Sequence, residues 1–181
     1  MDAIVLVAPP GWEEPAILLA EELGCSKVSA CVAGGETRTD SVRAGLREVP
    51  SEAAVVLVHD AARPLVTDDV VERVLQPLAA GWDGAVPGLP VPDTLKRVDG
   101  DGTIAETVER DGLWAVQTPQ AFLGYMLRRG YAGAAAATDC AALVEAAGGR
   151  IKVVEGDPRL LKVTTAADLG QVARLLSTET S

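Results

Sequence analysis

Two short, continuous apolar segments constrain the fold of this chain most strongly. Ala3–Ala8 is stopped by Pro9-Pro10-Gly11, and Ala53–Val58 is stopped by the polar segment His59–Pro64. Continuous apolar character over so few residues is typical of a strand buried on both faces, as in a parallel sheet covered by helices. We therefore expect both segments to be strands of such a sheet.

Helical segments and further strands alternate along the rest of the chain. Pro15 and Gly24 bracket a first helix, and Thr165 with Asp168 three residues later predicts a capping box for the last one. This alternation predicts an α/β fold, a single Rossmann-like domain over residues 1–181 with a doubly wound, mainly parallel sheet. The other expected strands are Lys27–Val32, Gly84–Leu89, Trp114–Gln117 and Ile151–Val154, and the expected helices are Ala16–Leu23, one after Gly34-Gly35, Thr67–Gln76, Ala121–Arg129, Ala134–Ala147 and one after Thr165.

One segment departs from this alternation. Thr94–Val98 and Thr103–Val108 flank Asp99-Gly100-Asp101-Gly102, a strong hairpin signal. Charged side chains occur along both strands, so the hairpin lacks a fully buried face. We expect residues 93–113 to form an arm that leaves the main body and needs a partner chain.

Composition excludes several classes of function. The net charge is -10, which argues against binding of nucleic acid or of an anionic membrane, because both require clustered Lys and Arg. Three cysteines (Cys25, Cys31, Cys140) and one histidine cannot form a full disulfide framework or a zinc ribbon. No apolar stretch is long enough to cross a membrane, and Asp2 stands where a signal peptide carries a basic residue. We expect a soluble, cytoplasmic protein.

Polar residues follow the predicted strands, where ligands bind in open α/β sheets. Asp60 follows Val58 directly, and a carboxylate there can ligate Mg²⁺. Alternatively, Asp60 only caps the turn and Arg63 is a solvated charge, and position alone does not separate the two interpretations. Gly34-Gly35, before a helix N-terminus, permits close approach of a base or phosphate, although such a pair is common in ordinary loops.

The segments that follow the predicted strands and the arm occur in a specific order along the chain. The sequence resembles the 2-C-methyl-D-erythritol 4-phosphate cytidylyltransferases of the non-mevalonate isoprenoid pathway, from residue 3 to about Ala173. The resemblance rests on Gly34-Gly35 with Arg38 and Ser41-Val42, His59-Asp60-Ala61-Ala62-Arg63-Pro64, Asp93-Thr94-Leu95-Lys96-Arg97, Thr107-Val108-Glu109-Arg110, Gln117-Thr118-Pro119-Gln120-Ala121-Phe122 and Lys162-Val163-Thr164-Thr165.

The resemblance implies transfer of CMP from CTP to the phosphate of methylerythritol phosphate, with release of pyrophosphate. The substrate phosphate is itself the nucleophile, so catalysis consists of positioning and charge neutralisation. By similarity, Lys162, Arg110 and Asp60 are catalytic, and Thr94, Arg110 and Lys162 bind methylerythritol phosphate. Gly34, Gly35, Arg38, Ser41, Asp60 and Arg63 bind the nucleotide, and Asp60 and Asp157 hold Mg²⁺ or another divalent cation.

The resemblance also implies a homodimer, because in this family Arg110 comes from the arm of the neighbouring subunit. Family members begin with a strand and a Gly-rich loop that wraps the triphosphate, whereas here Met1–Val5 aligns with their second strand. We therefore expect a start upstream of Met1, an unpaired edge on Ala3–Ala8 and on Ala53–Val58, and weak or no activity of the chain as written. Two alternatives are a polyol-phosphate (ribitol phosphate) cytidylyltransferase and a non-catalytic family member that only dimerises.

Overall fold

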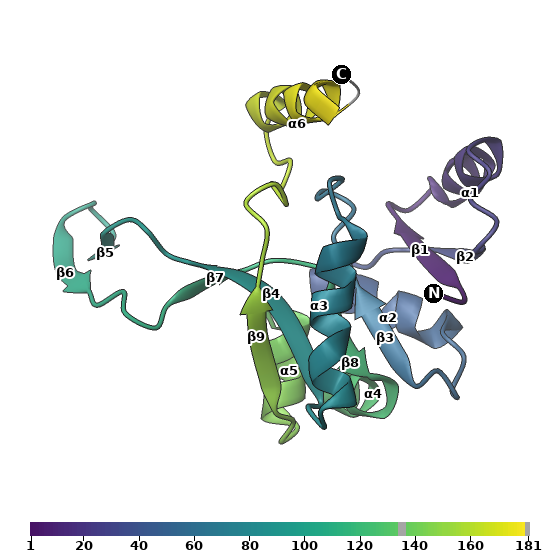
Figure 1. Cartoon of the computed structure of the whole chain (residues 1–181), viewed down its shortest axis with the longest axis horizontal. Coiled ribbons are helices and arrows are strands. Elements are labelled where there is room, and N and C mark those ends of the chain that lie inside the picture. Colours follow the sequence, from purple (N-terminus) through teal and green to yellow (C-terminus); the bar gives the residue numbers. More distant parts are fainter. Residues whose placement is uncertain (134–136, 180–181) are drawn as a thin grey trace.

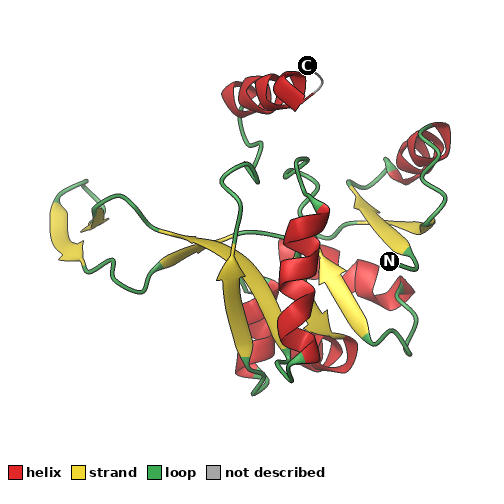
Figure 2. Cartoon of the chain, viewed as in Figure 1, coloured by secondary structure: helices red, strands yellow, loops and turns green. Residues whose placement is uncertain are grey.

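The computed structural model describes residues 1–133 and 137–179 and divides into a central body and three outlying parts. The body is a five-stranded sheet with helices on both faces. A two-stranded sheet, a β-hairpin and a C-terminal helix extend from it in different directions (Figures 1 and 2). The fold is therefore α/β, as the sequence predicts.

The central sheet is mixed rather than mainly parallel. Its order is β3 (Val55–Val58), β8 (Gln120–Leu123), β4 (Gly84–Pro90) and β7 (Trp114–Val116), and β9 (Ile151–Glu155) pairs with β4. The β4–β9 pair is parallel, but β8 is antiparallel to both β3 and β4, and β7 is antiparallel to β4. The prediction of a mainly parallel sheet is wrong because two strands after the hairpin return in the opposite direction.

Strand β8 replaces the first residues of the predicted helix Ala121–Arg129. Ala121 and Phe122 are fully buried between neighbouring strands, and helix α4 (Gly124–Ala132) begins only after them. Tertiary pairing overrides the helix preference of this Ala- and Leu-containing segment. The strand brings Gln117–Gln120 to one end of the sheet.

Each face of the sheet has its own apolar core. Helix α3 (Asp68–Ala79) lies against one face, and α4 and α5 (Cys140–Ala146) lie against the other (Figure 1). Because successive strand residues point to opposite faces, Ala85 and Ala121 pack under α3, whereas Val86 and Phe122 pack under α4 and α5. Alternate side chains of β4 and β8 therefore pack against helices on both faces of the sheet.

Helix α5 is shorter than the predicted helix Ala134–Ala147. It begins at Cys140, after Asp139, whose side chain accepts a hydrogen bond from the Ala142 N–H. Residues 137–139 are not helical, and residues 134–136 of the predicted helix lie outside the described residues. The N-cap at Asp139 defines the start of α5.

The two-stranded sheet joins β1 (Ile4–Ala8) and β2 (Val28–Ala33) in parallel, with α1 (Glu13–Glu22) and α2 (Arg38–Glu48) packed against it. Among the described residues, β1 pairs only with β2, and β3 pairs only with β8. Each of the two strands thus has one free edge, as expected, and Val7 and Val55 are 41% and 36% exposed.

Two elements extend from the body. The hairpin of β5 (Leu95–Val98) and β6 (Ile104–Val108) projects as an arm, as predicted. Helix α6 (Ala166–Glu179) lies apart from the sheet, and its capping box is present: Asp168 accepts hydrogen bonds from the Thr164 and Thr165 N–H groups, which lowers its pKa to about 2. Among the described residues, no helix is long and apolar enough to cross a membrane.

We expect Phe122→Ala to lower the free energy of unfolding by about 3–5 kcal/mol, because the ring is fully buried and its removal leaves a cavity. Denaturant unfolding measures the change. Leu18→Ala, at a position 57% exposed on α1, is the control and is expected to change the free energy by less than about 0.5 kcal/mol. Equal effects of the two substitutions would contradict the placement of β8 in the core.

Candidate active site

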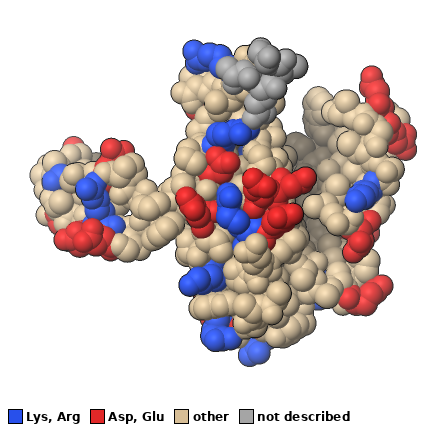
Figure 3. All heavy atoms as spheres, in the orientation of Figure 1, with Lys and Arg blue, Asp and Glu red and all other residues tan. Residues whose placement is uncertain are grey.

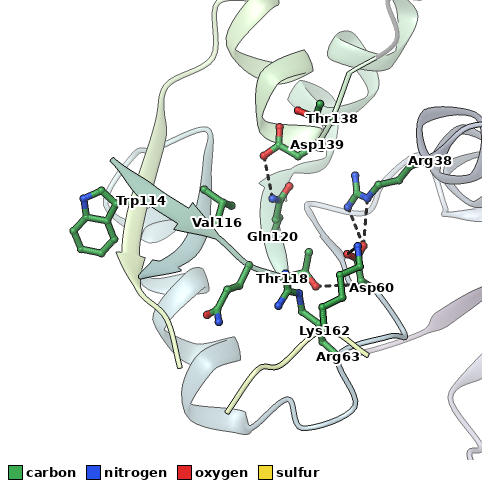
Figure 4. A pocket seen from close by; sticks show the side chains of 11 residues that line it. Arg38, Asp60, Arg63, Trp114, Val116, Thr118, Gln120, Thr138, Asp139 and Lys162 are labelled. Atoms are coloured by element: carbon green, nitrogen blue, oxygen red, sulfur yellow. Dashed lines mark hydrogen bonds and ion pairs between the residues drawn. The ribbon is translucent and has the colours of Figure 1, made fainter. Parts of the chain in front are cut away.

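A pocket of about 380 Å³ opens where β3, β7, β8, the start of α5 and the C-terminal segment meet (Figure 4). Its wall combines residues that the sequence predicts for the site with others that it does not. The lining residues are Arg38, Asp60, Arg63, Trp114, Val116, Gln117, Thr118, Gln120, Thr138, Asp139 and Lys162.

Asp60 is the central group of the pocket. Its Oδ1 accepts hydrogen bonds from Arg38 Nε and Nη2 at 3.3 and 3.2 Å, and its Oδ2 lies 3.0 Å from Lys162 Nζ. Burial alone would raise the pKa of Asp60, but the Lys162 hydrogen bond and the charge of Arg38 outweigh burial and place this pKa below its usual value. Asp60 is therefore a carboxylate with a cation on each oxygen.

The segment after β3 holds Asp60 in place through a chain of hydrogen bonds. The Asp60 N–H donates to Thr118 Oγ1 at 3.0 Å, and Thr118 Oγ1 lies 3.2 Å from His59 Nδ1. His59 Nε2 lies 3.0 Å from the Arg63 carbonyl oxygen, which can only accept, so Nε2 carries the proton. Burial lowers the pKa of His59 and so favours the neutral ring, in which Nδ1 accepts from the Thr118 hydroxyl.

Lys162 reaches the pocket because the C-terminal segment is fastened to the same loop. Arg63 Nη1 donates to the Leu160 carbonyl oxygen at 2.5 Å, and the Val163 N–H donates to the Ala62 carbonyl oxygen at 2.8 Å. Arg63 thus connects the loop after β3 to the C-terminal segment. Residues about 100 positions apart in the chain are thereby held on two sides of one pocket.

Arg38 is held from two sides. It is the first residue of α2, and besides Asp60 its Nη1 contacts Cys140 Sγ at 3.4 Å. The Cys140 thiol is fully buried and also lies 3.2 Å from Tyr131 Oη. Burial raises the pKa of this thiol, so it stays protonated and connects Arg38 to the core.

The glycine-containing loop lies beside the pocket rather than in its wall. Ser41 Oγ accepts from the Gly35 N–H at 3.1 Å and donates to the Thr37 carbonyl oxygen at 3.0 Å. A Cβ on Gly35 would lie 2.4 Å from Asp40 Cβ, so only glycine fits there. Gly34, Gly35 and Ser41 are outside the lining residues, and Arg38 connects their loop to the pocket.

Three predicted residues lie away from the pocket. Thr94 and Arg110 are at the base of the arm, where Arg110 donates to the Pro92 carbonyl oxygen. Asp157 follows β9, and its Oδ1 accepts from the Arg159 N–H at 2.8 Å. None of the three lines the pocket, so within this chain the structure does not bring them to Asp60.

The structure adds residues that sequence reasoning missed. Trp114, Val116, Gln117, Thr118 and Gln120 reach the pocket from β7, β8 and the turn between them, and Thr138 and Asp139 from the segment before α5. The ordered motif from Gln117 to Phe122 is a sequence signal for Gln117, Thr118 and Gln120, whereas nothing in the sequence marks Trp114 and Val116. Thr138 and Asp139 were not predicted as site residues because they lie within the expected helix Ala134–Ala147.

A divalent cation would find one carboxylate at the centre of this pocket. In the described parts of the chain, no three His, Cys, Asp or Glu side chains cluster in a way that could hold a metal ion. Mg²⁺ commonly binds through one or two carboxylates together with substrate phosphates. Asp60 fits that pattern, because a triphosphate in the pocket would supply the remaining oxygen ligands.

Positive charge exceeds negative charge inside the pocket, although the chain as a whole is acidic. Its wall carries Arg38, Arg63 and Lys162 against Asp60 and Asp139. On the face drawn in Figure 3, acidic side chains gather at the end that carries α1, and basic and acidic side chains mix over the middle. The pocket therefore suits an anionic ligand.

We expect the pKa of His59 to lie below its ordinary value of about 6.5, because partial burial and the charge of Arg63 both disfavour the imidazolium. His59 is the single histidine, so an NMR titration of its ring reports this pKa directly. Because this pKa is lowered in the folded state, the stability from neutral His59 is complete above about pH 6.5 and is lost as the pH falls through the folded pKa.

Thermal unfolding between pH 7 and pH 5 tests the same linkage. His59→Gln should show a smaller loss of Tm over this range than the unsubstituted chain, because Gln does not titrate. A His59 pKa at or above 6.5, or identical pH profiles of the two proteins, would contradict the hydrogen-bond chain from Asp60 to Arg63.

Comparisons with known proteins identify the family. Residues 1–178 match the family model described as IspD: 2-C-methyl-D-erythritol 4-phosphate cytidylyltransferase. The enzyme of that name from Nocardia farcinica is 46% identical over 176 residues, which cover 97% of this chain and 75% of the relative. The one from Rhodococcus jostii is 46% identical over 171 residues, which cover 93% and 73%.

Solved structures agree. A crystal structure of 4-diphosphocytidyl-2C-methyl-D-erythritol synthase superposes with a TM-score of 0.83 at 36% identity, covering 97% of this chain and 82% of that one. The Thermus thermophilus 2-C-methyl-D-erythritol 4-phosphate cytidylyltransferase gives a TM-score of 0.78 at 37% identity, covering 96% and 81%. The chain belongs to the 2-C-methyl-D-erythritol 4-phosphate cytidylyltransferase family, and it is a nucleotidyltransferase.

Proposed function

We propose that the Asp60 pocket transfers CMP from CTP to the phosphate of 2-C-methyl-D-erythritol 4-phosphate and releases pyrophosphate. The observation that carries this assignment is the Asp60 carboxylate, paired with Arg38 on one oxygen and with Lys162 on the other at the pocket wall. Family membership supplies the reaction. The pocket supplies cations where two phosphorylated substrates must meet.

The reaction needs charge neutralisation more than a protein nucleophile. An oxygen of the methylerythritol phosphate attacks the α-phosphorus of CTP, the new P–O bond forms, and the bond from the α-phosphorus to the bridging oxygen of pyrophosphate breaks. Both reactants are anions, so their approach is repulsive in the absence of nearby cations. Arg38, Arg63 and Lys162 reduce that repulsion and hold the phosphates for in-line attack.

Cys140 and His59, two nucleophilic side chains near the pocket, are unsuited to covalent catalysis. Cys140 is fully buried, and burial raises the pKa of its thiol. His59 uses both ring nitrogens in hydrogen bonds to Thr118 and Arg63. Direct attack by the substrate phosphate is consistent with both observations.

Asp60 is the residue we assign to the divalent cation, with Asp157 as a second, weaker candidate that lies outside the pocket wall. Mg²⁺ or a similar ion, when bound with the triphosphate, would supply further positive charge at the α-phosphate. Asp60 would exchange part of its present pairing with Arg38 and Lys162 for that ion. Both cations would then turn to the phosphates of the substrates.

We assign the cytidine to the loop beside the pocket. Gly34 and Gly35 carry no side chain that would hold a base away from the backbone, and Ser41 fixes the loop through hydrogen bonds to Gly35 and Thr37. Arg38 begins the helix that follows this loop and contacts Asp60. A nucleotide held at the loop would therefore present its phosphates to the pocket.

We further propose that the chain forms a homodimer in which the arm of one subunit completes the site of the other. Thr94 and Arg110 lie at the base of the arm and outside their own pocket. The arm exposes Val98 and Ile104, which are 55% and 59% accessible in the single chain. Contact with a second copy would cover these side chains and bring its Arg110 to the methylerythritol phosphate.

We expect Lys162→Met to lower kcat/KM for methylerythritol phosphate by about 10²–10³-fold, because it removes a cation that faces the reacting phosphates. Asp60→Asn should cause a loss of the same order, and the required concentration of Mg²⁺ should rise. Pyrophosphate release from CTP measures turnover, and calorimetric titration with methylerythritol phosphate measures binding without turnover.

Lys152→Met on β9 is the control, since this lysine stacks over Trp82 away from the pocket. It is expected to retain turnover. Wild-type levels of turnover by Lys162→Met would refute the assigned site. Preference for ribitol phosphate over methylerythritol phosphate in the unsubstituted chain would refute the assigned substrate.

A mixture of two inactive variants tests the role of the partner's arm. If Arg110 acts on the neighbouring pocket, equal amounts of Arg110→Ala and Lys162→Met protein should regain roughly a quarter of the wild-type activity, because half of the dimers then contain one intact site. Analytical ultracentrifugation confirms that mixed dimers form. A mixture that forms dimers and stays inactive would place Arg110 in its own chain's site.

A further inference from the structure

Gln120 has an unused hydrogen-bonding atom at the pocket wall. It is the first residue of β8, is only 1% exposed and lines the pocket between Asp139 and Thr118 (Figure 4). Its Nε2 donates to Asp139 Oδ2 at 3.2 Å. Its Oε1 is buried and has no hydrogen-bond partner among the described residues.

Chemistry determines which way this amide points. A carboxylate oxygen can accept a hydrogen bond and cannot donate one, and the other oxygen of Asp139 already accepts from the Ala142 N–H at the start of α5. The amide nitrogen of Gln120 must therefore face Asp139. A flipped amide would place two acceptors against each other, so Oε1 is the free atom in the stable orientation.

The neighbouring Gln117 shows that a free amide oxygen is not a general property of this wall. Its Nε2 donates to the Asp157 carbonyl oxygen at 2.9 Å, and its Oε1 accepts from the Asp157 N–H at 3.0 Å. Both glutamines are buried and line the same pocket. Only Gln120 retains an acceptor, and a buried acceptor without a donor lowers stability unless a ligand or water supplies one.

The position of Gln120 selects the kind of donor. Arg38, Arg63 and Lys162 take up one part of the pocket and suit a phosphate, whereas Gln120 and Asp139 present acceptor oxygens elsewhere along its wall. The loop assigned to cytidine lies outside the wall. A ligand with its phosphate on the cations and hydroxyl groups along its carbon chain would match both parts.

We propose that Gln120 Oε1 accepts a hydrogen bond from a hydroxyl group of the polyol phosphate that receives CMP, and that Gln120 thereby determines specificity for a hydroxylated acceptor. This inference rests on the proposed function for the identity of that acceptor. Asp139 holds the amide in this orientation, and Trp114 and Val116 provide apolar surface in the same pocket wall. A site that hydrogen-bonds a substrate hydroxyl discriminates against analogues that lack it, because the acceptor is then left unpaired.

Gln120→Met tests the proposal against a set of methylerythritol phosphate analogues that each lack one hydroxyl group. Met has a similar length and cannot accept a strong hydrogen bond. We expect the KM of the Gln120→Met variant for methylerythritol phosphate to rise about 10- to 100-fold, with the KM for CTP unchanged. One deoxy analogue, the one that lacks the hydroxyl bound by Gln120, should bind to the variant and to the unsubstituted chain with the same affinity. In that case neither protein can form the hydrogen bond.

Gln117→Met is the matched control, because it removes a buried amide at the same wall that has no free acceptor. It is expected to lower Tm by loosening the Asp157 segment and to affect all analogues by the same factor. Uniform weakening across the analogues in Gln120→Met, or a change confined to the KM for CTP, would overturn the specificity role. Thermal unfolding checks that each variant is folded.

Binding measured by calorimetry separates this inference from the proposed function. If the unsubstituted chain binds methylerythritol phosphate but does not transfer CMP to it, the proposed function fails, and the analogue series, measured as Kd by calorimetry, still decides the role of Gln120. If it binds no polyol phosphate, both are overturned.

Discussion

The Asp60 carboxylate is the interaction on which the arrangement of the site depends. It connects three segments that are distant in sequence: the start of α2 through Arg38, the loop after β3, and the C-terminal segment through Lys162. A half-buried carboxylate is costly to desolvate unless cations and hydrogen bonds compensate it. Here each oxygen has a cation and the backbone N–H is bound by Thr118, so removing any one partner would leave the others poorly compensated.

The mixed sheet places these partners. Strand β8 runs antiparallel between β3 and β4. Its first residues therefore lie at the end of the sheet where β3 ends and the loop with Asp60 follows. In this way Thr118 reaches Asp60, and Gln120 reaches the start of α5. A parallel strand in the same place would present its last residues there instead. The direction of β8 is therefore what brings the segment from Gln117 to Gln120 into the site.

The sequence predicts single elements better than it predicts the contacts between them. The apolar strand before Asp60, the arm and the capping box at Thr165 follow from local patterns, and all three are present. The strand at Ala121 and Phe122 was missed because its residues favour a helix and only burial between two other strands makes it extended. The pairing of Asp60 with Lys162 joins residues 102 positions apart, which no local pattern encodes. The resemblance to a family assigned both residues to one site but did not predict that they pair.

An acidic chain can still hold an anionic substrate, because the relevant charges are the near ones. At physiological ionic strength, charges more than about 10 Å apart are largely screened, so the overall charge of -10 acts weakly inside the pocket. Arg38 and Lys162 act at contact distance and are already held in place by Asp60. An arriving phosphate oxygen offers them the same kind of acceptor that the carboxylate does, so they can change partner with little reorganisation. Preorganised cations of this kind are most effective where charge develops during phosphoryl transfer, and in the proposed function Asp60 would keep Arg38 and Lys162 ordered until the substrate arrives.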